Sequence, residues 1–151
     1  MKLTKKLKRT ETYRTAMHEA THAVIRIACD LPFEHVEVYD CPRDGAHGCL
    51  ATDNRHLTNW VDVYAMAVST AAPYWTEMHF CGDEEEATAH TWDDEQAVQE
   101  VAPILRVHVN EIYRKAKKLV EENWARIECV AVALMENRKL TYDEVCTLVE
   151  A

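Results

Sequence analysis

Residues 10–29 read TETYRTAMHEATHAVIRIAC, and this stretch decides how the chain folds. Apolar residues recur through it at helical spacing, at positions 13, 16, 17, 20, 24, 27 and 28. A repeat of three to four residues is typical of a helix that buries one face. Neither glycine nor proline interrupts the stretch before Pro32. The pattern therefore predicts a long, partly buried helix over about residues 10–29.

The middle of this helix carries the motif His18-Glu19-Ala20-Thr21-His22, which reads H-E-x-x-H. Side chains four residues apart share one helix face, with about 5–6 Å between their Cβ atoms. Two imidazoles so placed can bind one divalent ion, and the adjacent glutamate can take a proton from a water beside it. The motif predicts a Zn²⁺ site held by His18 and His22, with Glu19 as catalytic base. The alternative is a surface helix that carries two histidines by chance.

A catalytic zinc site has a third protein ligand and an open fourth position. The most common metalloprotease extension would supply a histidine six residues after His22, but that position is Ala28. The third ligand must therefore come from farther along the chain. The candidates are Glu77, His79, His90, Asp93 and Asp94.

Helical phase favours Asp94 among these candidates. The helix expected after residue 91 has a predicted buried face at Ala97, Val98, Val101 and Leu105. Asp94 projects from that face at helical spacing, whereas Asp93 shares less of it and becomes the ligand only if the register shifts by one. Thr91 is a possible N-cap. Acidic residues at a helix start often serve only the helix dipole, so that reading stays open.

Composition restricts the class of protein. The chain has 151 residues, 48% of them hydrophobic and 28% charged, which suits a single domain over residues 1–151 with a packed core. A formal net charge of −9 argues against nucleic-acid binding, which needs a basic surface.

Residues 1–9 form a basic tail, interpreted as a frayed helix start, with a membrane-surface contact or docking tail as the alternative.

Several other functions are excluded by what the sequence lacks. The sequence contains no apolar run of 18 residues, so no membrane span is predicted. No secretory signal is recognised either, so a cytoplasmic protein is expected. Three glycines are too few for a P-loop or a dinucleotide fingerprint. The six cysteines lack C-x-x-C spacing and are expected to be reduced, mostly core residues rather than zinc ligands.

The remaining chain is predicted to be mainly helical, in an α+β fold with a small β-hairpin or sheet edge beside the H-E-x-x-H helix. Strands are expected at 35–39 and 49–52, around a turn-rich loop at 41–48. An acidic loop is expected at 81–91. Further helices are expected at 57–80 with a kink or fresh start at Pro73, at 92–122 interrupted by Pro103, at 123–137, and after a capping box at Thr141-x-x-Glu144.

From about residue 13 onward the sequence resembles the M41 family, the zinc peptidase domain of FtsH-type proteases. Residues 17–24, MHEATHAV, are similar to the family's HEAGHAV segment, and residues 41–48 to its PRG-x-x-LG turn. Residues 72–77 stand where the family has AGRAAE, and residues 92–94 resemble the S-N-D segment that supplies the third ligand. Residues 123–128 and 139–145 resemble its closing helices.

The resemblance implies a zincin-like helical domain that works as a zinc-dependent metalloendopeptidase. It assigns zinc binding to His18, His22 and Asp94, or Asp93 one register away, and base catalysis to Glu19. Glu77 would be structural or support a ligand. The strand near Gly48 would line the cleft, where an extended peptide could add as a strand.

The sequence departs from the family at Thr21 and Pro73, which replace glycines, and looser helix packing is expected at Thr21. It contains no ATPase module or membrane segment, so ATP-independent action on unfolded or flexible polypeptides is expected, with a homo-oligomer possible. The alternative is a zincin-like peptide-binding or regulatory module that is catalytically inactive or dedicated to one partner.

Overall fold

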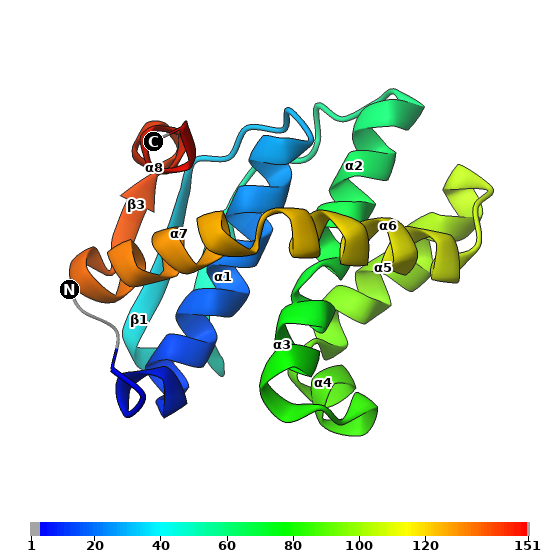
Figure 1. Cartoon of the computed structure of the whole chain (residues 1–151). Helices are drawn as coiled ribbons and strands as arrows, with labels where there is room; N and C mark the ends of the chain where they lie inside the picture. The colour runs from blue at the N-terminus through cyan, green and yellow to red at the C-terminus, as the bar shows by residue number, and fades with distance from the viewer. Residues whose placement is uncertain (1–3, 151) are drawn as a thin grey trace.

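The structure is a computed structural model that describes residues 4–150, so Lys2 of the predicted basic tail lies outside the described residues. The prediction of a mainly helical α+β fold with a small sheet is confirmed (Figure 1). The elements follow the order η1 (Leu7–Arg9), α1 (Glu11–Ala28), β1 (His35–Arg43), β2 (Ala46–Ala51), α2 (Trp60–Ala71), α3 (Pro73–Cys81), α4 (Glu84–His90), α5 (Trp92–Leu105), α6 (Val109–Glu122), α7 (Trp124–Asn137), β3 (Lys139–Thr141) and α8 (Tyr142–Glu150).

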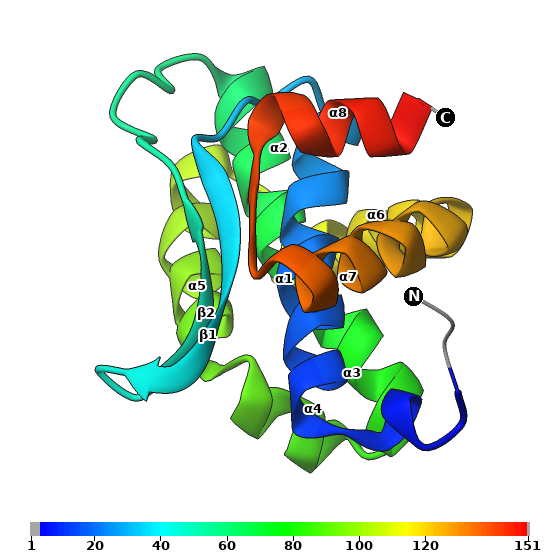
Figure 2. The ribbon, with the colours of Figure 1, turned by 90° about the vertical axis from the view of Figure 1, so that its left-hand side faces the viewer.

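Helix α1 is the centre of the molecule, and its predicted span is confirmed to within a residue at each end. Thr10 caps it, because the Thr10 hydroxyl accepts a hydrogen bond from the backbone N–H of Tyr13. Its buried apolar side chains include Met17, Val24 and Ile25, each at most 1% exposed. Helices α2, α3 and α7 and the strands β1 and β2 all pack against it (Figures 1 and 2).

The sheet has the strand order β2-β1-β3 and is antiparallel throughout. Val36 and Val38 are buried in the core, so the alternate residues of β1 face the other side of the sheet. The predicted hairpin is confirmed but is longer than expected, because only Asp44 and Gly45 form its turn, both with positive φ. An irregular register between Val38 and Arg43 lets the strand continue through a stretch predicted as loop.

Of the two prolines expected to mark helix boundaries, one does so and the other does not. Over 57–80 the fresh start predicted at Pro73 is confirmed, because α2 ends at Ala71 and Pro73 begins α3. The helix predicted over 92–122 breaks at Arg106, in the left-handed conformation, whereas Pro103 lies inside α5.

The acidic loop predicted at 81–91 is wrong, because residues 84–90 form α4. The Asp83 carboxylate accepts a hydrogen bond from the Glu85 N–H at 3.0 Å and so caps this helix. The acids that suggested a loop occupy the first turn of α4, where the helix dipole favours negative charge.

The predicted capping box is confirmed. The Thr141 hydroxyl accepts from the Glu144 N–H at 3.2 Å, and the Glu144 carboxylate accepts from the Thr141 N–H at 2.7 Å. The frayed helix start expected in the basic tail is not found in its described part, residues 4–9, of which Leu7–Arg9 form the separate short helix η1.

The prediction that most cysteines are core residues is wrong. All six are free thiols, with Cys41 and Cys129 exposed and the other four half-buried. Among residues 4–150, no helix combines the length and the apolar character needed to cross a membrane.

Candidate metal centre

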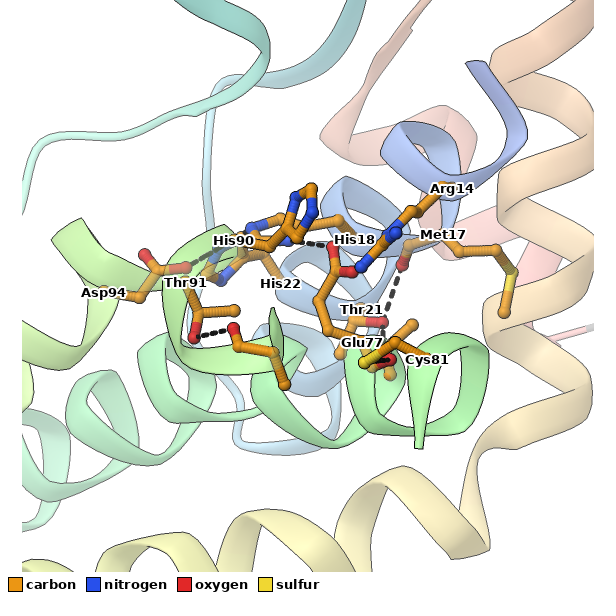
Figure 3. Close-up of polar contacts among 12 residues, drawn as sticks. Arg14, Met17, His18, Thr21, His22, Glu77, Cys81, His90, Thr91 and Asp94 are labelled. Atoms are coloured by element: carbon orange, nitrogen blue, oxygen red, sulfur yellow. Dashed lines mark hydrogen bonds and ion pairs between the residues drawn. The ribbon is translucent and has the colours of Figure 1, made fainter. Parts of the chain in front are cut away.

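The two motif histidines lie on one face of α1, with their ring centroids 5.2 Å apart. Asp94, in the first turn of α5, points its carboxylate toward both rings (Figure 3). The Asp94 Oδ2 atom lies 3.3 Å from His18 Nε2 and 3.2 Å from His22 Nε2. The histidine pair and Asp94, about seventy residues apart in the sequence, thus direct their side chains to one point.

These separations fit a tetrahedral zinc ion. With bonds of about 2.0–2.2 Å to nitrogen and oxygen, two ligands of one tetrahedral ion lie roughly 3.3–3.6 Å apart. The two Nε2–Oδ2 distances, 3.2 and 3.3 Å, are close to that value. The donor set of two imidazoles and one carboxylate also matches the three-ligand catalytic zinc sites that keep one position open.

The other ring nitrogen of each histidine is held in place. His22 Nδ1 lies 2.9 Å from the carbonyl oxygen of Ser69, which can only accept, so Nδ1 carries the hydrogen. His18 Nδ1 lies 3.2 Å from a carboxylate oxygen of Glu77. Both contacts leave Nε2 as the nitrogen available to a metal, and they are of the kind that orients metal-binding histidines.

Arg14 fixes Glu77 in turn. Its guanidinium donates from Nε to Glu77 Oε2 and from Nη1 to Glu86 Oε1, the latter at 3.1 Å. Glu77 is 3% exposed, so its charge is compensated by Arg14 and His18 rather than by water. Glu77 is therefore a supporting residue and not one of the three converging groups, as the resemblance implied.

The electrostatics of the site couple the three converging groups. Burial by itself would lower the pKa of His18, but hydrogen bonds with Asp94 and Glu77 outweigh it and raise that pKa to about 10. Burial also opposes the protonated form of His22, yet attraction to Asp94 leaves its pKa raised. The pKa of Asp94 is lowered, because both imidazoles outweigh its burial. A metal-free site therefore holds protons that a cation would have to displace.

Glu19 belongs to α1, and its side chain lies against β2 and is 8% exposed. Burial raises the pKa of its carboxyl group, although His18 and His22 act in the opposite direction. A raised pKa suits a general base, which has to accept a proton near neutral pH. Gly48 makes room for this side chain, because a Cβ at that position would lie 2.9 Å from Glu19 Cγ and 2.7 Å from the Glu37 carbonyl oxygen.

The converging groups open onto a cleft of about 530 Å³. Its walls are α1, the β1–β2 hairpin, residues 69–70 of α2 and the α4–α5 junction. Both Glu19 and the ligand set line this space, so a molecule entering it meets the candidate metal centre and the proposed base together. Strand β2 borders the cleft along residues 46–50.

The other ligand candidates take different positions. Asp93 is exposed at the cleft rim, one residue from the converging group. His79 packs against Trp124, with ring centroids 4.4 Å apart. His90 lines the cleft, and its Nε2 lies 3.9 Å from Glu86 Oε1.

The phase argument selected the aspartate that the structure brings to the histidines, but one of its premises is wrong. Ala97 is exposed, and the buried positions of α5 are Val98, Ala102 and Leu105. The Thr91 hydroxyl does not cap α5 but donates to the Ala87 carbonyl oxygen at 2.8 Å.

Two features of the site region escaped prediction. Ser69 acts through its backbone carbonyl, which no side-chain pattern reveals. His35, Glu37 and Cys49 form a second cluster of possible metal ligands, with one donor atom from each lying within 4.8 Å of the others. The alternation of His35 and Glu37 on a predicted strand signals that they share a face, but their pairing with Cys49 depends on the hairpin register.

The sequence matches no protein-family model, and no curated protein is significantly similar to it. The resemblance to the M41 family therefore stays a prediction. The function of the candidate metal centre has to be inferred from its own geometry and chemistry.

Proposed function

We propose that the protein is a zinc-dependent metalloendopeptidase of the M41 type, with His18, His22 and Asp94 as the zinc ligands. The observation that carries the proposal is the meeting of Asp94 Oδ2 with both Nε2 atoms at 3.2–3.3 Å, beside Glu19 and inside an open cleft. Bound zinc supplies Lewis acidity, lowering the pKa of a coordinated water to about 7 and polarising the scissile carbonyl.

The protein's own groups divide the remaining work. Glu19 takes a proton from the attacking water and delivers it to the leaving amine nitrogen. Glu77 and the Ser69 carbonyl keep the Nε2 atoms of His18 and His22 directed at the ion. Arg14 keeps Glu77 charged and in position.

The shape of the cleft favours a polypeptide substrate in extended form. In the sheet, β2 pairs with β1 on one side only, and its residues 46–50 line the cleft. An edge strand of this kind presents backbone donors and acceptors to which an extended chain can pair. We therefore propose unfolded or flexible polypeptides as the substrate class.

Thr21, which replaces the family's glycine, is compatible with this proposal. Its side chain is fully buried, and its hydroxyl lies 2.7 Å from both the Met17 carbonyl oxygen and the Thr76 hydroxyl. The expectation of looser packing is therefore wrong: Thr21 lies in the contact between α1 and α3. With Thr21 in place, His18 and His22 lie on one face of α1, with ring centroids 5.2 Å apart.

The test uses purified protein loaded with Zn²⁺ and an unfolded casein-type substrate. The wild type should cleave the substrate and lose activity with a chelator. Glu19→Gln should keep its zinc while the rate falls by about 10²–10⁴, the usual contribution of a general base. Cleavage by Glu19→Gln at the wild-type rate would contradict the mechanism.

The same experiment distinguishes the alternative function. A wild-type protein that binds zinc and captures the unfolded chain without cutting it would be a peptide-binding module. A protein that cleaves only one dedicated partner would hold zinc, fail on the generic substrate and still depend on Glu19 with that partner.

A further inference from the structure

The outward face of the β1–β2 hairpin carries three side chains of metal-binding type, none of which belongs to the candidate metal centre, although Cys49 also borders its cleft. His35 and Glu37 alternate along β1, and Cys49 lies on β2 directly opposite Glu37 in the antiparallel register. Because Val36 and Val38 are buried in the core, the alternate residues His35 and Glu37 point to the other side of the sheet. Strand pairing thus gathers an imidazole, a carboxylate and a thiol on one small surface.

The donor atoms lie at distances that suit a shared ion. His35 Nε2 is 3.6 Å from Glu37 Oε2, which exceeds a hydrogen bond but falls within the roughly 3.3–3.6 Å separation of nitrogen and oxygen ligands on a tetrahedral zinc ion. One donor atom from each of the three residues lies within 4.8 Å of the others. The side chains of His35 and Glu37 are only 23% and 18% exposed, so their positions are restricted by neighbours.

Two cationic residues flank the cluster, Arg43 on β1 and Lys139 on β3, the strand partner of Glu37. Arg43 lies 3.6 Å from Glu37 Oε1, the oxygen not directed at His35, and its guanidinium stacks over the Tyr39 ring. A hydrogen bond with Cys49 raises the pKa of the Tyr39 hydroxyl. Tyr39 therefore lies beside Cys49 on this part of the hairpin.

We propose that His35, Glu37 and Cys49 form a second site, which binds a divalent transition-metal ion such as Zn²⁺. Thiolate and imidazole together favour Zn²⁺ over Mg²⁺ or Ca²⁺, and three protein ligands leave a fourth position for water. Cys49 binds as the thiolate, so loading releases its proton to solvent. An ion here ties β1 to β2 next to Gly48, where β2 meets Glu19.

Co²⁺ is the probe that separates the two sites, because only the hairpin site contains sulfur. Thiolate coordination to Co²⁺ gives a strong near-ultraviolet charge-transfer absorption, which a site of two histidines and an aspartate cannot produce. The metal-free full-length wild type should bind two equivalents of Co²⁺ and show this absorption. Cys49→Ser should bind one equivalent and lose the absorption, whereas Cys129→Ser, which removes an exposed thiol elsewhere, should keep both.

Two further variants keep the result interpretable. His35→Asn should weaken the sulfur-linked Co²⁺ binding at least tenfold, even if Cys49→Ser folds poorly. The double variant His18→Ala/His22→Ala should lose one equivalent and keep the absorption. If the double variant keeps the charge-transfer absorption, the hairpin site is supported even if the proposed peptidase centre binds no metal.

Two results would overturn the hairpin site. One is a wild type that binds Co²⁺ without charge-transfer absorption, and the other is an absorption that persists in Cys49→Ser.

Discussion

Gly48 and Glu19 are in such close contact that no side chain larger than hydrogen fits between them. A Cβ at position 48 would lie 2.9 Å from Glu19 Cγ, and 2.7 Å from the Glu37 carbonyl oxygen on the neighbouring strand. The second of these contacts is with backbone, which cannot rotate aside. The position of the proposed base is therefore linked to the smallest residue on the strand that borders the cleft.

Gly48→Ala should shift Glu19 or separate β2 from β1. We expect kcat/KM on an unfolded substrate to fall at least tenfold, with a loss of about 1–3 kcal/mol in the free energy of unfolding. Steady-state kinetics and urea denaturation measure the two effects. Gly45→Asn is the matched control, because a Cβ there meets no atom within 4 Å and asparagine tolerates positive φ. Equal activity in both variants would show that the contact with Glu19 is unimportant.

Asp94→Asn should reduce zinc affinity by about a hundredfold or more, because it removes a charged ligand rather than a supporting group. Asp93→Asn makes the same chemical change one residue away, on an exposed side chain, and should leave affinity nearly unchanged. Competition with a chromogenic chelator measures both affinities. If the Asp93 variant were the one that lost zinc, the ligand assignment would have to move by one residue.

Glu77→Gln should weaken zinc binding by about 10–100-fold, the range typical of groups that orient a metal-binding histidine. The change removes the charge that faces His18 Nδ1 and Arg14. Glu86→Gln is the control, since Glu86 also pairs with Arg14 but is 46% exposed and does not touch His18. Calorimetric titration with Zn²⁺ should therefore separate the two variants, and equal affinities would remove Glu77 from the site.

Zinc binding should become tighter as pH rises from about 6 to 9. The folded metal-free protein holds the pKa of His18 at about 10, above the ordinary 6.5, so a bound proton competes with the ion across this range. By the same linkage, the stabilisation that protonated His18 gives the metal-free fold is fully present below pH 6.5 and is lost as pH rises toward 10.

Titration in buffers of different ionisation enthalpy would count the protons released when zinc binds. At neutral pH, about one proton should come from His18 for each ion bound, and His18→Gln should release fewer. A pH-independent affinity, with no proton release, would contradict these linked equilibria.

Local sequence patterns predicted the helical part of the site well. Residues 18 and 22 share a helix face because of helical geometry alone, and the phase of the later helix selected Asp94 over Asp93. The capping box at Thr141 and Glu144 was equally visible, since both its hydrogen bonds connect residues three apart. Interactions of this range depend on the local sequence and little else.

Features that depend on long-range packing were not predictable in the same way. The acidic run at 84–86 is a different case, a missed local signal, because Asp83 caps α4 through the Glu85 N–H only two residues away. Strand β3 has three residues, too few to give an alternating pattern, and forms because β1 provides its partner. The carbonyl of Ser69 reaches His22 only once α2 packs against α1.

The origin of Asp94 on a different helix from the two histidines has a consequence for the denatured chain. In the denatured chain, His22 and Asp94 are separated by about seventy residues, so no preformed site exists there and the ion would bind the folded chain preferentially. An ion that binds only the folded chain stabilises it by an amount that grows with ion concentration, about 2.7 kcal/mol at a hundred times Kd. The ion proposed for hydrolysis would thus also hold two distant parts of the fold together.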